Sequence, residues 1–336
     1  MNDRIPLEPP VIAPVSNLTE ERPLWSVMIP AYNCINYLKY TIQSVLAQDP
    51  GEEHMQIEVV DDFSTDGDVA ALVKEVGKGR IKYFRQERNR GSLRNFETCL
   101  NRSRGHLVHL LHGDDQVKPG FYKEIEGLYN QNPEIGAAFT DFAIINEEGV
   151  EEDAYEASLP AKHGVIDNFV SIIAQCCYLQ TPAIVVRRSV YEKLGGFFAV
   201  HYGEDWEMWI RIAAHYPVAY SPQRLALYRS GHSSSITQRS LISGQNVKDI
   251  AKVIDIVQDY LPVEKKKQLK RLAKKNFSIM YAGQSYKMYR FQRRTAFIQA
   301  REALKLNINL RSLYWVIRLY ISHFFHLLHI DRYKQV

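Results

Sequence analysis

Two pairs of acidic residues, Asp61-Asp62 and Asp114-Asp115, stand where short apolar runs of the sequence end. Clustered carboxylates repel one another unless a cation or a hydrogen-bonding ligand lies among them. A divalent ion that carries substrate phosphates meets this need, because hard cations take oxygen ligands and share them with a diphosphate. Helix capping is the alternative, since Asp66 and Asp115 both precede predicted helices. The recurrence of the pairs after separate runs favours a metal and diphosphate site.

The apolar runs before these acids alternate with segments of helical spacing. Trp25–Pro30 has the composition of a buried strand closed by proline, and Asn36–Gln48 repeats apolar residues at helical spacing. The alternation recurs with predicted strands at 56–60, 81–84 and 106–111 and predicted helices at 69–76, 92–103 and 119–129. This order predicts an α/β fold with a mostly parallel sheet and right-handed crossovers. Ligands of such sheets bind at the carboxyl ends of the strands, where the acidic pairs stand.

The rest of the chain is predicted to be less regular. Ala137–Thr140 and Ala183–Arg187 have the composition of further strands, and Glu204–His215 has the spacing of a short helix. From Ser243 onward the sequence is helical and basic. We therefore predict three parts, a loose proline-rich arm at 1–23, a domain at 24–240 and a basic helical region at 241–336.

The composition is that of an ordinary globular protein with an uneven charge distribution. The 336 residues include 42 Lys/Arg, 38 Asp/Glu and 4 Cys, which excludes a collagen, a disordered chain and a disulfide scaffold. Residues 241–336 hold 19 Lys/Arg against 6 Asp/Glu, whereas residues 1–240 hold 23 against 32. No apolar run has the length of a signal peptide before Trp25 or of a membrane span anywhere. We therefore predict a cytoplasmic protein.

Three other classes of protein are disfavoured by the motifs and the charge distribution. The first predicted strand is not followed by G-x-G-x-x-G, and no P-loop occurs, which argues against a dinucleotide-dependent oxidoreductase or a P-loop enzyme. The basic region and the 20 tyrosines suggest nucleic-acid binding, but the part that holds the acidic motifs has a net negative charge. We predict no nucleic-acid partner.

Six stretches between residues 27 and 237 form an ordered set of motifs. They are VMIPAYNCINYLKYTIQSVLAQ (27–48), EVVDDFSTDG (58–67), ERNRGSLRNFETCLNRSRGHLVHLLHGDD (87–115), TPAIVVRRSVYEKLGGF (181–197), GEDWEMWIR (203–211) and YRSGHSSSIT (228–237). The set resembles the family 2 glycosyltransferases of the GT-A fold, over about residues 24–240. The resemblance implies a Rossmann-like sheet flanked by helices in a catalytic domain, with a C-terminal helical extension.

The resemblance implies a nucleotide site at the end of the first two strands. Pro30, Tyr32 and Asn33 match the loop that encloses the nucleotide. Asp62, with Asp61 beside it, matches the carboxylate that accepts a hydrogen bond from the uracil ring. An ionised carboxylate is a strong charge-assisted acceptor for such an N–H group.

The diphosphate and its metal ion are implied by a second group of matches. Arg94 matches the basic residue that approaches the diphosphate, although a solvated arginine on a helix face is the alternative. His112-Gly113-Asp114 occupies the family's D-x-D position, so Asp114 matches a metal ligand and His112 departs from the pattern. Asp115 matches the residue that contacts the ribose or the sugar. The resemblance thus implies Mn²⁺ or Mg²⁺ as cofactor.

A flexible segment near the end of the resemblance adds two candidates. His232 matches a basic residue that can reach the metal ion or the diphosphate, and Arg229 is a comparable candidate for phosphate. A lone histidine is as readily structural.

The acceptor side is implied by Gly203-Glu204-Asp205 at the start of a predicted helix. In the resembling motif the second acid is the general base, so Asp205 would remove the acceptor proton and Glu204 would orient the acceptor or the base. An acidic first turn favoured by the helix dipole is the alternative. Trp206 and Trp209 could offer an apolar platform to a sugar, but aromatic residues at this spacing more often belong to a core.

The resemblance implies an inverting enzyme that adds one sugar from a nucleotide-sugar, with UDP as the expected nucleotide. The expected acceptor is a hydroxyl group of a glycan or a lipid-linked glycan in cell-surface polysaccharide synthesis. A processive synthase is disfavoured because Q-x-x-R-W is absent. A catalytically inactive nucleotide-sugar-binding protein is the alternative, since His112 departs from the pattern.

The last predicted helix is amphipathic, and two uses of it remain open. Its apolar residues fall at helical spacing, and they are Leu313, Val316, Ile317, Tyr320, Ile321 and Phe324. This face could pack on the catalytic domain or on a second subunit, which would give a dimer. It could instead lie on an anionic membrane surface, and the excess of basic residues in this region favours that use.

Overall fold

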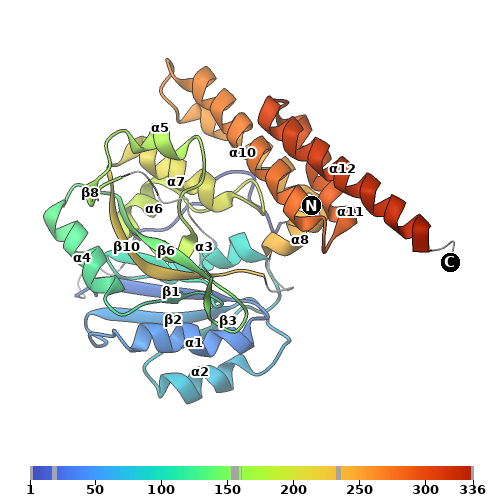
Figure 1. The fold of residues 1–336 in the computed structure, drawn as a ribbon. Helices are drawn as coiled ribbons and strands as arrows, with labels where there is room; N and C mark the ends of the chain where they lie inside the picture. Colours follow the sequence, from blue (N-terminus) through green and yellow to red (C-terminus); the bar gives the residue numbers. More distant parts are fainter. Residues whose placement is uncertain (1–2, 17–20, 153–158, 160, 232–235, 334–336) are drawn as a thin grey trace. The chain divides into compact units, whose positions relative to one another are not determined.

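The structure is a computed structural model that describes residues 3–16, 21–152, 159, 161–231 and 236–333, with side chains described as far as residue 326. The chain divides into two compact units (Figure 1). The first unit holds residues 1–173 and 177–235, and the second holds residues 174–176 and 236–336.

The first unit is built on one mixed sheet with strand order β3-β2-β1-β4-β9-β6-β10-β5. Its strands are β1 (Trp25–Ala31), β2 (Met55–Asp61), β3 (Lys82–Arg85), β4 (Leu107–Leu110), β5 (Gln116–Val117), β6 (Ala137–Ile145), β7 (Glu151–Glu152), β8 (Gly164–Val165), β9 (Ile184–Arg187) and β10 (Val218–Arg229). The predicted parallel arrangement holds for β3, β2, β1 and β4. β9 then runs antiparallel to both β4 and β6, which makes the second half of the sheet mixed.

The five longer helices of the first unit begin within two residues of their predicted positions, whereas the three short ones at 169–173, 181–183 and 188–194 were not predicted. In chain order the helices are α1 (Ile35–Leu46), α2 (Val69–Gly77), α3 (Ser92–Arg102), α4 (Phe121–Gln131), α5 (Phe169–Ile173), the 3-10 helix η1 (Thr181–Ala183), α6 (Arg188–Leu194) and α7 (Glu204–His215). Asp68 caps α2 by accepting from the Ala71 amide at 2.9 Å. Asp66, which we expected to cap that helix, instead accepts from the Ile35 amide at 2.9 Å and so caps α1. The expectation that Asp66 caps the helix after it is thus wrong, because Asp68 takes that position.

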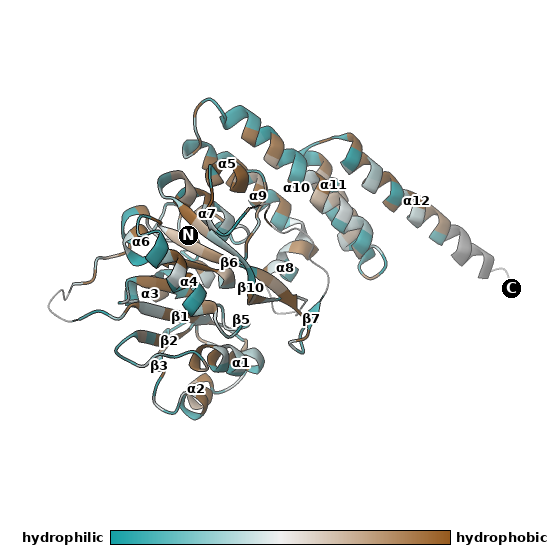
Figure 2. Cartoon of the chain, turned by 60° about the vertical axis from the view of Figure 1, so that its left-hand side comes forward, coloured by the Kyte–Doolittle hydropathy of each residue, from teal (hydrophilic) through white to brown (hydrophobic). Residues whose placement is uncertain are grey.

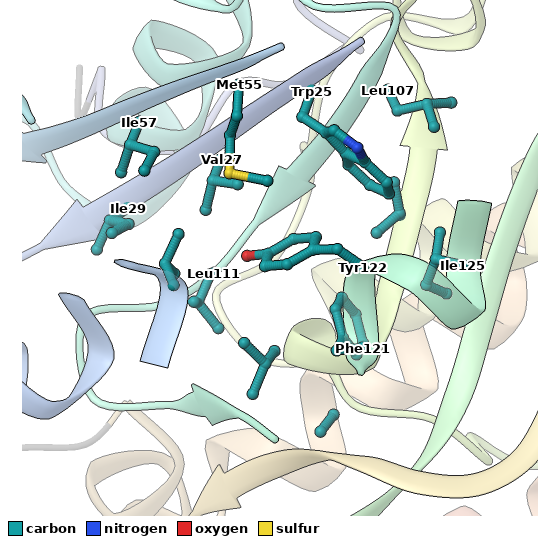
Figure 3. Close-up of a cluster of buried hydrophobic side chains, with 14 of the residues drawn as sticks. Trp25, Val27, Ile29, Met55, Ile57, Leu107, Leu111, Phe121, Tyr122 and Ile125 are labelled. Carbon is teal, nitrogen blue, oxygen red and sulfur yellow. The ribbon is translucent and has the colours of Figure 1, made fainter. Parts of the chain in front are cut away.

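Alternation along β1 decides which side chains enter the main core. Val27 and Ile29 point to the face covered by α1 and α4, where they join one buried cluster (Figure 3). Tyr122 of α4 lies beside Trp25 in an edge-to-face contact with ring centroids 5.2 Å apart. Aromatic pairs of this geometry add stability beyond the area they bury. This core holds the carboxyl ends of the parallel strands in fixed positions.

The longest strand of the first unit, β10, was missed by the sequence analysis. It pairs in parallel with β6, and its register shifts between Ser221 and Ala226. Pro222 lies in this irregular stretch, and a proline inside an apolar run argues against a central strand. The bulge accommodates the proline, because the ladder is already interrupted there.

The N-terminal segment is not the loose arm that its prolines suggested. Among its described residues, the Pro10 carbonyl accepts from the Gly196 amide and the Pro6 carbonyl accepts from the Ala199 amide, at 2.8 and 2.9 Å. Ile12 is 1% exposed. Prolines lack an amide donor but keep their carbonyls, so a proline-rich segment can still be anchored as an acceptor.

We expect Ile12→Ala to destabilise the protein by about 2–5 kcal/mol, the usual cost of removing a buried isoleucine side chain. Val11 is 81% exposed and is the matched control. Val11→Ala should change the free energy of unfolding by less than about 0.5 kcal/mol. Urea unfolding of both variants measures the difference, and equal stabilities would mean that the segment is loose in solution.

The second unit is helical. Its helices are α8 (Ile236–Ser243), α9 (Gln245–Ile256), the 3-10 helix η2 (Val257–Asp259), α10 (Lys266–Met288), α11 (Arg293–Leu306) and α12 (Leu310–Tyr333). α10 contacts both α11 and α12. Hydrophilic residues dominate the first half of α10 (Figure 2). Among the described residues, no helix is both long and apolar enough to cross a bilayer.

Candidate active site

Three of the predicted motifs meet at one edge of the sheet, because the strands that carry them are neighbours. β1 lies between β2 and β4 and runs parallel to both. Beyond the strands the pairing continues, since the Asp62 amide donates to the Ala31 carbonyl at 2.8 Å and the Gly113 amide donates to the Pro30 carbonyl at 3.0 Å. The loops that follow β1, β2 and β4 therefore leave the sheet side by side.

Asp61 is fully buried and fixes the loop after β2. Its Oδ1 accepts from the Ser64 amide at 2.9 Å, and its Oδ2 accepts from the Tyr83 hydroxyl and the Arg85 guanidinium, both at 2.7 Å. These bonds engage both carboxylate oxygens. In this structure Asp61 therefore ties the loop after β2 to the side chains of Tyr83 and Arg85 on β3.

Asp62 is 2% exposed and holds the loop that precedes α3. Its carboxylate accepts from the Asn89 side-chain amide at 2.9 Å and from the Arg90 and Gly91 backbone amides at 2.7 and 2.9 Å. Burial raises the pKa of Asp62, while the two backbone amides oppose that rise. A uracil ring that donates a hydrogen bond to Asp62 would have to share or replace these donors.

The loop after β1 presents one aromatic ring to solvent. Tyr32 is 41% exposed, whereas Asn33 is tied into the loop after β2. The Asn33 Oδ1 accepts from the Thr65 amide at 2.8 Å, and the Asn33 amide donates to the Ser64 hydroxyl at 3.0 Å. Asn33 has φ 49°, a left-handed conformation that asparagine tolerates. Asn33 therefore shapes the predicted nucleotide loop, and Tyr32 is its accessible surface.

His112, Asp114 and Asp115 form a group that could hold a metal ion, since one ligand atom of each lies within 4.8 Å of the others. Two atoms of the group, Nε2 of His112 and Oδ2 of Asp115, are buried and have no hydrogen-bond partner among the described residues. Buried polar atoms are usually satisfied, so such orphans call for a ligand. The donor set of one imidazole and two carboxylates fits a divalent cation. His112, which departs from the family pattern, thereby joins the group.

Burial sets the protonation of this group. Burial lowers the pKa of His112, although the Asp114 charge opposes the effect, and a lower pKa favours the neutral ring that a metal ligand requires. Burial, and next the Asp114 charge, raise the pKa of Asp115. The Asp115 Oδ1 accepts from the Arg229 amide at 2.8 Å, which orients the carboxyl group.

The Arg229 side chain is not placed as a phosphate ligand. It is 3% exposed, and its guanidinium donates to the backbone carbonyls of Asp114, Asn146 and Glu147 while stacking on the Tyr37 ring at 4.6 Å. Arg229 thus connects the loop that carries Asp114 to the loop after β6.

Arg94 is engaged by the N-terminal segment. Its guanidinium lies 2.8 Å from the Asp3 carboxylate and 2.7 Å from the Glu97 carboxylate, and its Nε donates to the Asp3 carbonyl at 2.8 Å. The hydrogen bond to Glu97 is the main cause of the raised pKa of Arg94. Contact with a diphosphate, as the resemblance implies, requires Arg94 to exchange these partners.

Asp205 and Glu204 lie in the first turn of α7. Gly203 precedes them with φ 83°, a left-handed conformation that lets the chain turn into the helix. Burial raises the pKa of Asp205 to about 6, against backbone hydrogen bonds that include the Trp206 amide at 2.7 Å. A carboxyl group that titrates near neutral pH is suited to general-base catalysis.

A chain of packed rings joins α7 to the metal-candidate group. The His112 ring stacks on Phe96 with centroids 5.1 Å apart, and Phe96 meets Phe197 edge-on at 5.5 Å. Phe197 in turn meets Trp209 edge-on at 6.0 Å. Asp205 stands four residues before Trp209 and thus on the same face of α7. Trp209, one turn after Asp205, is thus linked to His112 by packed rings.

The two tryptophans of α7 belong to the core. Trp206 and Trp209 are each 1% exposed, and the Trp206 indole donates to the Ile173 carbonyl at 2.8 Å. They do not offer a platform to a sugar. His232, the other predicted metal ligand, lies outside the described residues.

By sequence His112 departs from the family pattern, but the structure places it among the ligand candidates. The signal was available, because histidine is itself a common metal ligand. The ion pair between Asp3 and Arg94 could not be predicted from local sequence, because the two residues lie 91 positions apart.

The sequence profile of Glycosyl transferase family 2 matches residues 26–195. A putative teichuronic acid biosynthesis glycosyltransferase, TuaG of Bacillus subtilis strain 168, is 30% identical over 141 residues, which are 41% of this chain and 54% of that protein. An uncharacterised glycosyltransferase of Nostoc sp. is 27% identical over 250 residues, 70% of this chain and 74% of that one.

Solved structures share the fold at lower identity. S. aureus TarS (1–349) in complex with UDP-GlcNAc has a TM-score of 0.59 at 16% identity, over 88% of this chain and 79% of that chain. The mannosyltransferase PcManGT of Pyrobaculum calidifontis, in complex with GDP-Man and Mn²⁺, has a TM-score of 0.56 at 16% identity, over 94% and 87%. These matches confirm the predicted GT-A fold with its C-terminal helical region. With a family match over half of its length, the chain belongs to glycosyl transferase family 2.

Proposed function

We propose that this protein is an inverting, cytoplasmic glycosyltransferase that moves a single sugar from a UDP-sugar to a hydroxyl group of a glycan or lipid-linked glycan in cell-surface polysaccharide synthesis. The observation that carries the proposal is the metal-candidate group of His112, Asp114 and Asp115, in which two buried atoms have no described hydrogen-bond partner. Packed rings link His112 to Trp209 of α7, the helix whose first turn carries Asp205. The UDP-GlcNAc bound by TarS and the teichuronic acid pathway named for TuaG support the choice of donor and acceptor class.

The donor is proposed to bind at the carboxyl ends of β1 and β2. Pro30, Tyr32 and Asn33 would enclose the nucleoside, with the exposed Tyr32 ring as the stacking surface. Asp62 would accept from the base, and Asp61 would keep it in place through the bonds to Ser64, Tyr83 and Arg85. Asp115 would contact the ribose or sugar, and Arg94 the diphosphate.

Asp114, with His112 and Asp115 beside it, is proposed to hold the divalent ion. The nitrogen donor favours Mn²⁺ over Mg²⁺, which prefers a shell of oxygens alone. When bound, the ion supplies Lewis-acid stabilisation of the departing diphosphate oxygens.

Asp205 is proposed to act as the general base. It would take the proton of the acceptor hydroxyl as that oxygen forms a bond to the anomeric carbon and the bond from this carbon to UDP breaks. A single displacement from the opposite face inverts the anomeric configuration. Glu204, one residue before Asp205, would orient the acceptor.

A thermal-shift panel of UDP-, GDP- and dTDP-sugars with and without Mn²⁺ tests the donor, since a specific ligand raises stability by mass action. We expect stabilisation by one UDP-sugar that grows with Mn²⁺, and release of UDP when a glycan acceptor is added. Stabilisation without any release of UDP or transfer of sugar would instead identify an inactive nucleotide-sugar-binding protein.

A further inference from the structure

Helix α12 uses only one of its faces inside the second unit. Ser312, Val316 and Leu319 on one side are at most 6% exposed. The packing is aromatic, with Trp315 against Tyr286 at 5.5 Å and His323 accepting from or donating to the Tyr289 hydroxyl at 3.0 Å. Helical spacing predicts that Val316 shares an apolar face with Ile317 and Phe324, but the structure buries Val316 and exposes the other two.

The opposite face of α12 is apolar and exposed. Every residue of this face is at least half exposed, and its members are Leu310, Tyr314, Ile317, Tyr320, Ile321, Phe324 and Phe325. The last five of these, without Leu310 and Tyr314, line one open groove. Contiguous exposed apolar side chains of this kind commonly mark a surface that another molecule covers. We call these seven residues the α12 face.

The charges around the α12 face favour an anionic partner. No Asp or Glu occurs between Ala303 and Ile330, whereas Arg311 and Arg318 stand beside the face. The Arg318 guanidinium lies over the Tyr286 ring at 4.6 Å and donates to the Tyr314 hydroxyl at 2.9 Å. Arginines next to tyrosine and tryptophan rings are typical of helices that lie at a membrane–water boundary.

We propose that the α12 face lies in the headgroup region of an anionic lipid bilayer. The apolar side chains would enter the acyl boundary, and Arg311 with Arg318 would meet lipid phosphates. A second copy of the chain fits less well, because pairing two such faces would bring arginines together without an acid to balance them. This proposal concerns the membrane association of the protein, and it does not depend on the proposed sugar-transfer reaction.

Vesicle flotation of the full-length protein tests the proposal. We expect binding to vesicles of phosphatidylcholine with about 30% phosphatidylglycerol to be at least about tenfold stronger than to phosphatidylcholine alone, because basic residues are attracted to anionic lipid. This binding should weaken in high salt. The double variant Ile317→Ser with Phe324→Ser should bind at least about tenfold more weakly, because each serine removes apolar surface that would enter the bilayer.

Phe291→Ser is the matched control, since Phe291 is 87% exposed in the same unit but is not part of the α12 face. It should bind vesicles within about twofold of the wild type. Near-UV circular dichroism verifies that both variants keep the native packing. Equal binding of all three proteins, or no preference for anionic vesicles, would overturn the proposal. A lipid-free dimer that the double variant dissociates would overturn it in favour of a second copy.

Discussion

Asp205→Asn is expected to lower kcat by about 10²–10⁴-fold, the usual contribution of a general base. The change keeps the size of the side chain and an oxygen that can accept from the Trp206 amide, so α7 should begin at the same residue. Donor affinity should stay within about threefold of the wild type, because the base acts on the acceptor. Steady-state kinetics and titration with UDP separate the two effects. If UDP binding collapses instead, Asp205 has a different role.

The pH profile gives an independent test of the same residue. Burial raises the pKa of Asp205 to about 6, and a general base must be deprotonated to work. Below about pH 6 the wild-type kcat/KM should therefore fall by about tenfold per pH unit, and above it the rate should level off. The residual activity of Asp205→Asn should lack this limb. Asp167→Asn, an exposed acid of the same unit, should keep both the rate and the limb.

The strands that carry the site were predictable because each is a short apolar run that ends in polar residues. Alternation with helices was enough to place β1, β2 and β4 in parallel, and parallel strands bring their carboxyl ends to one edge. The positions of Asp61-Asp62 and Asp114-Asp115 at that edge follow from this rule alone. The recurrence of the pairs favoured a metal and diphosphate site over helix caps, and the resemblance then implied a role for each acid.

The partners of the site residues were not predictable from local pattern. Asp62 accepts from three groups of the loop at 89–91, and Arg94 pairs with Asp3. Such contacts join residues far apart in the sequence, so no periodicity reports them. The N-terminal prolines suggested a loose arm because proline-rich composition is common in linkers. Only the tertiary structure shows that their carbonyls meet amides at 196 and 199.

Asp114→Asn is expected to remove the dependence on a divalent ion and to lower kcat by about 10²-fold or more, because a Lewis acid at a departing diphosphate is worth several kcal/mol. An amide keeps the shape of Asp114 but loses the charge that a hard cation requires. Mn²⁺ should then no longer add to the thermal stabilisation by UDP. Chelation of metal from the wild type should reproduce the loss, and added Mn²⁺ should restore only the wild type.

His112→Gln separates the metal role of this group from its packing. The substitution removes the orphan Nε2 and the ring that stacks on Phe96, so some loss of stability is expected from packing alone. A weaker affinity for Mn²⁺ would show that the ring nitrogen is a ligand, and Phe96→Leu, which alters the same stack but keeps the imidazole, should leave that affinity within about threefold. If Asp114→Asn still binds UDP more tightly with Mn²⁺ than without, the ion is held elsewhere. The acidic pair after β4 would then serve only to shape the loop, and the departing diphosphate would have to be stabilised by cationic side chains such as Arg94, freed from Asp3 and Glu97.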